Sequence, residues 1–136
     1  MPTEPTKTLA RAYRARPGGM SLHAAIACAR LGATARLLGR VGEDTAAAFL
    51  RQRLQSEGVQ AQGLEAVPGT TTSLAAVIVD AAGARQIYIH RGDALRRGHA
   101  LDTRQLEGAD VVMADTRWPE GAQVALAWAR RHGVPS

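Results

Sequence analysis

The sequence has 136 residues, the length of one ordinary domain, and its 46% hydrophobic and 21% charged residues are typical of a soluble globular protein. The formal net charge is +5, but the arginines are dispersed along the chain and no aromatic residues alternate with them. We therefore predict no nucleic-acid binding. The sequence contains no apolar run of about eighteen residues and no apolar segment behind a basic start, so we also predict no contact with a membrane.

Cysteine and histidine content limits the chemistry further. Cys28 is the single cysteine, which excludes an internal disulfide bond and favours a reducing, cytoplasmic location. The four histidines are far apart and have neither the i, i+4 spacing nor a cysteine partner that would indicate a metal site. We predict a cytoplasmic protein without a bound metal ion.

The sequence pattern of residues 1–31 predicts a disordered terminus followed by a strand and a helix. Residues 1–7 contain two prolines and are expected to be disordered. Residues 8–16 alternate in a way that fits a half-exposed strand, which Pro17 and the following glycine pair end. Ser21 is expected to cap a helix over residues 22–31.

A second strand and helix are predicted next. Residues 34–38 form a short apolar run that fits a strand. Asp44 or Thr45 is a suitable cap for the helix that follows and that Gly58 ends. The core face of this helix is expected to carry Phe49, Leu50 and Leu54.

The remaining patterns predict a hairpin, a buried strand and a last helix. Residues 71–80 are rich in β-branched side chains, residues 81–84 form a turn, and residues 85–90 alternate as a strand does. Residues 111–114 are fully apolar, as in a central strand of a covered parallel sheet. The last helix is expected to begin at Pro119.

Alternating strands and helices predict an α/β fold in which helices pack on a parallel sheet. The last helix is followed by no further strand in this sequence. Two or three parallel strands are fewer than the roughly five or six of a typical sheet. We therefore expect an incomplete α/β domain.

Two features are candidates for ligand contacts. Gly18 and Gly19 stand before a predicted helix, where glycine lets a ligand approach the backbone and the helix start offers free N–H donors. Taken alone, the pair is more typical of an ordinary strand-to-helix turn. Asp115 lies at the end of a predicted strand, where it could contact a ligand or, about equally well, cap the next helix.

Longer motifs resemble a known family. Residues 18–25, 29–32 and 38–44 together resemble the first signature of PfkB-type (ribokinase-like) carbohydrate kinases, and the similarity continues over residues 8–135. The start of the last helix, residues 117–122, looks like bacterial members near the ketohexokinase and sulfofructose-kinase branches.

The resemblance implies a fold and a domain plan. The fold is a ribokinase-like three-layer sheet with helices on both faces and a small β-sheet lid, here incomplete. Residues 8–16 and 71–91 would form the lid. Residues 17–70 and 92–136 would form the partial α/β core.

The resemblance also implies site residues. Gly18, Gly19 and His23 would contact the sugar, with His23 in place of the family's asparagine. Arg91 would lie near the reacting phosphate, where a positive charge assists phosphoryl transfer. Further site residues, ranked lower, are Asp44, Asp93 and Asp115.

Members of the family transfer phosphate from ATP, with Mg²⁺, to a sugar hydroxyl. The catalytic base belongs to a Gly-x-Gly-Asp motif that this sequence lacks, so we expect no catalytic residue and no strong ATP binding in this chain. The prediction is the N-terminal, sugar-binding part of such a kinase, inactive by itself, for a ketose or a pentose. The alternative is a non-catalytic sugar-binding or assembly module that forms a homodimer through the lid strands.

Overall fold

The computed structural model describes residues 7–92, 95 and 101–136, and its centre is a short parallel sheet. Strand β1 (Gly39–Val41) pairs with β2 (Leu64–Ala66), with Gly39 opposite Leu64. A bridge between Arg36 and Gln60 extends the same parallel pairing toward the start of β1. Helix α2 (Thr45–Ser56) connects the two strands, which makes a βαβ unit.

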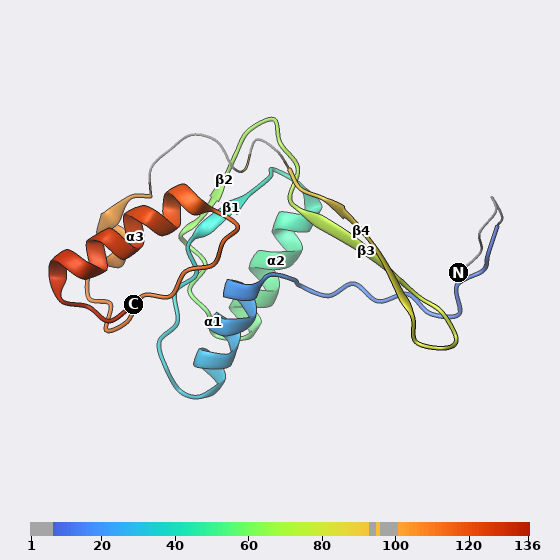
Figure 1. The fold of residues 1–136 in the computed structure, drawn as a ribbon, viewed down its shortest axis with the longest axis horizontal. Helices are drawn as coiled ribbons and strands as arrows, with labels where there is room; N and C mark the ends of the chain where they lie inside the picture. Colours follow the sequence, from blue (N-terminus) through green and yellow to red (C-terminus); the bar gives the residue numbers. More distant parts are fainter. Residues whose placement is uncertain (1–6, 93–94, 96–100) are drawn as a thin grey trace.

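Helices pack on both faces of this sheet (Figure 1). Leu37 lies in a core with α1 (Met20–Arg30) and α2, whereas Leu38 packs against a second core formed with α3 (Pro119–His132). Neighbouring residues of an extended chain point to opposite faces. The predicted arrangement of helices on both faces of an incomplete sheet is therefore confirmed.

The second core joins α3 to the 3₁₀ helix η2 (Thr103–Leu106). Helix α3 begins with Pro119 as predicted, and Gly133 ends it in the left-handed conformation with a φ of 67°. Its buried residues are Gly121, Ala125, Trp128 and Ala129, and of these Ala129 is completely buried. No helix in the described part of the chain is long and apolar enough to cross a membrane.

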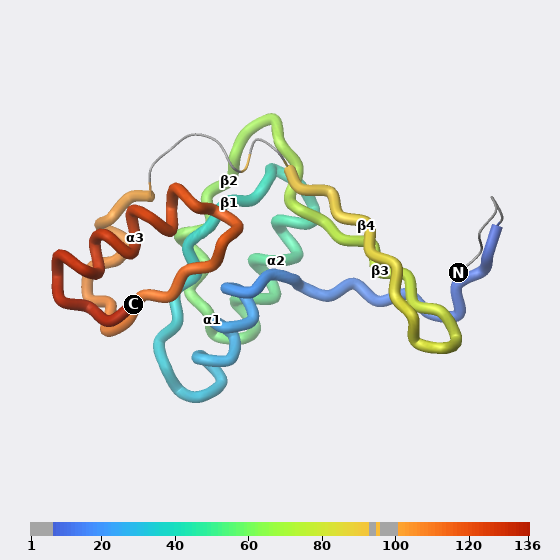
Figure 2. The backbone as a smooth tube through the Cα atoms, viewed as in Figure 1, coloured from blue at the N-terminus to red at the C-terminus, as the bar shows by residue number. Residues whose placement is uncertain are grey.

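A long hairpin projects from the opposite side of the molecule to α3 (Figure 2). Strand β3 (Leu74–Val79) pairs antiparallel with β4 (Arg85–His90). In the turn, the Asp80 carboxylate accepts hydrogen bonds from the N–H groups of Ala82 and Ala84 at 3.0 and 2.9 Å. The hairpin predicted from the sequence is present, although every residue of both strands is exposed.

Three predicted strands differ from the structure. Residues 8–16 form no strand, residues 34–38 form only the single bridge at Arg36, and residues 111–114 form no strand and pair with none among the described residues. The N–H of Val112 donates instead to the carbonyl oxygen of Pro135 at 2.9 Å. A strand needs a partner for its N–H and C=O groups, which sequence periodicity does not reveal.

Two predictions about side chains also change. Phe49 is 38% exposed and not part of the core face, because it lies five positions, about 140° around the helix, from the fully buried Leu54. Ser21 does not cap α1, since the cap position is Gly19. The prediction that Asp44 caps α2 is confirmed, as its carboxylate accepts from the N–H of Ala47 at 2.8 Å.

We expect Leu54→Ala to lower the free energy of unfolding by about 2–5 kcal/mol, because it removes a completely buried side chain and leaves a cavity between α1 and α2. Urea denaturation followed by circular dichroism measures the change. Leu31→Ala, at a side chain that is 87% exposed, is the matched control. Equal losses in the two variants would contradict the position of the core.

Candidate functional site

The start of α1 is built on two glycines. Gly19 has a φ of 121°, a conformation that residues with a Cβ atom rarely adopt. A Cβ atom added at Gly18 would meet no atom within 4 Å. The first N–H groups of a helix have no partner within the helix. Open space therefore lies beside Gly18, next to the first turn of α1.

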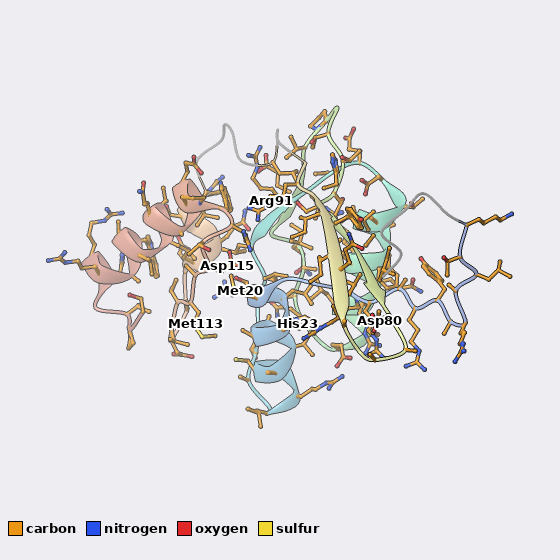
Figure 3. All side chains as sticks on the ribbon, turned by 45° about the vertical axis from the view of Figure 1, so that its right-hand side comes forward. Met20, His23, Asp80, Arg91, Met113 and Asp115 are labelled. Carbon is orange, nitrogen blue, oxygen red and sulfur yellow. The ribbon has the colours of Figure 1, made fainter. Side chains whose placement is uncertain are left out.

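Asp115 connects this helix start to the second half of the chain (Figure 3). Its Oδ2 accepts hydrogen bonds from the N–H and the hydroxyl of Ser21, at 3.2 and 2.7 Å. Its Oδ1 accepts from the N–H of Arg117 at 2.8 Å. Asp115 thus accepts hydrogen bonds from the first turn of α1. It does not cap α3, because the cap position of α3 is Trp118.

The environment of Asp115 favours its ionised form. Partial burial acts to raise the pKa of this carboxyl, but the hydrogen bonds from Ser21 and Arg117 together lower the pKa below its usual range. An ionised carboxylate accepts hydrogen bonds and donates none. Asp115 is therefore an acceptor at the edge of a group of backbone donors.

His23 lies one turn into α1 and is exposed. Its Nε2 is 3.3 Å from the carbonyl oxygen of Pro17, so the ring leans back toward the residue before the glycine pair. An imidazole can donate or accept a hydrogen bond, depending on its tautomer. The structure thus brings Gly18, Gly19, His23 and Asp115 together at the start of α1.

The other predicted site residues belong elsewhere. Asp44 bonds with Thr72, at the root of the hairpin. Arg91 is exposed and follows β4 directly, so it also lies at the hairpin root. Asp93 lies outside the described residues. The predicted site residues that the structure describes therefore form two groups, one at α1 and one at the hairpin root.

Sequence reasoning missed two residues that organise these groups. Ser21 was expected to cap its own helix, and its partner Asp115 is 94 positions away. Thr72 was expected only as part of a strand, and its partner Asp44 is 28 positions away. No local pattern could reveal such pairs, although a threonine run before an exposed strand was a weak signal for the second.

Comparison with known proteins identifies the class of protein. The family model for pfkB family carbohydrate kinases matches residues 2–135. A ribokinase from Bacillus subtilis is 30% identical over 131 residues, which are 93% of this chain and 44% of the relative. A chloroplastic protein of Arabidopsis thaliana described as probable fructokinase-6 is 34% identical over 105 residues, 75% of this chain and 27% of the relative.

A solved structure has the same fold. The structure of Arabidopsis thaliana ribokinase, described as complexed with ribose and ATP, matches with a TM-score of 0.86 at 22% identity and covers 99% of this chain and 46% of that one. The chain belongs to the pfkB family of carbohydrate kinases, as the sequence motifs indicated. It spans less than half the length of these relatives.

The comparisons confirm the predicted family and its ribokinase-like fold. The relatives compared are ribokinases and fructokinases, so the branch near ketohexokinase and sulfofructose kinase stays a prediction. The division of the chain into lid and core, and the individual site residues, also stay predictions.

We expect Gly19→Ala and Gly18→Ala to differ in stability. A Cβ atom at the φ of Gly19 costs roughly 1–3 kcal/mol of strain. At Gly18 the same atom meets nothing, and the change should stay within about 0.5 kcal/mol. Thermal unfolding followed by circular dichroism measures both. A Gly19→Ala variant as stable as the parent would contradict the backbone geometry at the start of α1.

Proposed function

We propose that this chain forms the sugar-binding part of an ATP-dependent carbohydrate kinase, with the start of α1 as the sugar site. The arrangement that carries the proposal is the open space at Gly18 beside the first turn of α1, together with the Asp115 carboxylate that is hydrogen-bonded to that turn. A sugar hydroxyl is both a donor and an acceptor. Donors and an acceptor around one opening match that chemistry.

Each residue has a definite part in this proposal. Gly18 lets the sugar lie close to the backbone, because a side chain there would occupy the open space, and Gly19 supplies the positive φ with which the chain enters α1 beside the sugar. The N–H groups of the first turn of α1, apart from that of Ser21, which donates to Asp115, donate to sugar oxygens. Asp115 accepts from a sugar hydroxyl while it holds Ser21. His23 supplies one further hydrogen bond in the place of the family's asparagine.

The residues present do not fit a complete ATP site. The sequence has no Gly-x-Gly-Asp motif to supply a base and phosphate-binding amides. Among the described residues, no three His, Cys, Asp or Glu side chains gather as ligands for a metal ion. Arg91 remains our candidate for a phosphate contact, and ATP and Mg²⁺ are assigned to the whole kinase, not to a site in this chain.

The names of the relatives support a proposal for the class of sugar. One relative is named a ribokinase and another a probable fructokinase, so we propose a pentose or a ketohexose as the substrate. We also propose that the protein acts in the cytoplasm, where the single free Cys28 would stay reduced.

Calorimetric titration of the purified chain with ribose and with fructose tests the sugar site. We expect binding in the millimolar range or tighter for one of the two. Gly18→Ala should weaken that binding about tenfold, equal to roughly 1.4 kcal/mol, because the added methyl group enters the space for the sugar.

Leu31→Ala, at the exposed far end of α1, should bind like the parent. A folded chain that releases no heat with either sugar at millimolar concentration would overturn the proposal.

The exposed hairpin supports a second role, in assembly. One face of the hairpin carries Val77, Val79, Ile87 and Ile89, each at least half exposed. Two-stranded hairpins are at best marginally stable without packing on one face. We propose that this face packs against the same face of a second copy, as a homodimer through the lid strands.

Sedimentation velocity over a range of protein concentrations tests the dimer. We expect Ile87→Lys to shift the chain to the monomer, because it places a charge in the centre of the apolar face. Gln86→Lys, on the opposite face, is the control. A parent chain that stays monomeric at about 100 μM would contradict this second proposal, since a specific interface should be occupied there.

A further inference from the structure

The direction of the β3–β4 hairpin has to be set at its root. Every residue of β3 and β4 is exposed, so no helix or sheet buries a face of the hairpin within the described residues. The hairpin is joined to the rest of the molecule by residues 70–73 and 90–92, and Figure 1 shows it extending away from the helices beyond that point. Contacts in these two segments must therefore hold it.

Asp44 makes the central contact. Its Oδ2 accepts a hydrogen bond from the N–H of Thr72 at 2.7 Å, and its Oδ1 accepts from the Thr72 hydroxyl at 2.7 Å. The same Oδ1 accepts from the N–H of Ala47 in the first turn of α2 at 2.8 Å. One carboxylate thus joins the start of a helix to the start of the hairpin.

Thr72 is held on its other side as well. It is the one polar residue that is buried among the described residues, at 6% exposure. Its Oγ1 accepts from the N–H of Gly42 at 3.0 Å. A Cβ atom on Gly42 would lie 2.5 Å from the carbonyl oxygen of Thr70, so the loop before α2 and the hairpin root are in direct backbone contact.

The returning strand is tied to the same place. His90 Nε2 lies 2.8 Å from Thr71 Oγ1, which is a hydrogen bond between the last residue of β4 and the segment before β3. A Cβ atom on Gly92 would overlap the carbonyl oxygen of Thr71. Both ends of the hairpin therefore meet beside Thr72, and Asp44 connects that point to α2.

We infer that Asp44 is a positioning residue, which fixes the direction of the hairpin relative to the helices through its hydrogen bonds to Thr72. One consequence for sugar binding, that the hairpin acts as a lid for a sugar bound at the start of α1, rests on the proposed function. The role of Asp44 in holding the hairpin does not depend on that function.

The ionisation of Asp44 is consistent with this role. Hydrogen bonds from the N–H of Thr72, the N–H of Ala47 and the hydroxyl of Thr72 lower the pKa of Asp44 below its usual range. The carboxylate is therefore ionised at neutral pH and offers both oxygens as acceptors.

Asp44→Asn separates the two contacts of this side chain. Asparagine caps helices as well as aspartate does, and its one carbonyl oxygen can still accept from Ala47. That oxygen, in the Oδ1 position, also keeps the bond from the Thr72 hydroxyl, whereas the amide group in the Oδ2 position has only donors to present to the N–H of Thr72. The variant should keep α2 and lose the hydrogen bond from the Thr72 N–H, which weakens the link to the hairpin.

The test measures a distance between two spin labels by double electron–electron resonance, in a Cys28→Ala background. The labels are placed at Gln52→Cys on α2 and Ala76→Cys on β3, both at exposed positions. We expect Asp44→Asn to broaden the distance distribution about twofold, because the root can then take up several angles. Thr72→Val, which keeps the side-chain volume but removes the hydroxyl, should broaden it in the same direction.

Asp102→Asn is the matched control, because Asp102 accepts from a backbone N–H at the start of η2 and lies outside the hairpin root. It should leave the distribution unchanged. An unchanged distribution in Asp44→Asn, with the helical circular-dichroism signal of the parent, would overturn the inference. If Asp44→Asn fails to fold, an unchanged distribution in Thr72→Val overturns it instead.

The two proposals can fail separately. A broadened distribution in the variants, together with no sugar binding by the parent, supports the role of Asp44 and rejects the sugar site. Sugar binding by the parent with no broadening in the variants rejects the role of Asp44 alone.

Discussion

Leu37 and Leu38 are neighbours in the chain but belong to different cores, and this alternation organises the molecule. Leu37 faces α1 and α2, and Leu38 faces α3 and η2. Because successive residues of an extended chain point to opposite sides, this short segment contributes one side chain to the core on each face of the sheet. Arg36 adds to the link, since its guanidinium donates to the carbonyl oxygens of Gln105 and Glu107, each at 2.9 Å.

The Asp115 carboxylate adds a second link between the two halves of the chain. It joins the first turn of α1 to the segment that precedes α3, across 94 positions of sequence. The sugar site proposed above thus lies where the two halves of the chain meet. Loss of packing in either half would displace Asp115 relative to the glycine pair, so the site depends on both cores.

Much of the fold could be predicted because its signals are local. The Asp44 cap, Pro119 at the first position of α3 and the alternating hairpin strands depend on residues a few positions apart. The strand predicted over residues 111–114 failed because its pattern shows that the segment is apolar, not whether a neighbour is there to pair with it. The glycine pair and, from its position at the end of an apolar segment, Asp115 were candidates from the sequence and stay predictions, but no pattern indicated the bond from Asp115 to Ser21 that joins them.

The two ends of the hairpin also leave the body at one point, since Thr71 and His90 are in hydrogen-bond contact. A segment whose ends adjoin can be lengthened or replaced without moving the structure beneath it. The body of this protein and its projecting strands can therefore diverge at different rates during evolution. Residues 42, 44 and 72 form the boundary between the helices and parallel sheet, whose residues are constrained by packing, and the hairpin, whose exposed residues can change with a ligand or partner.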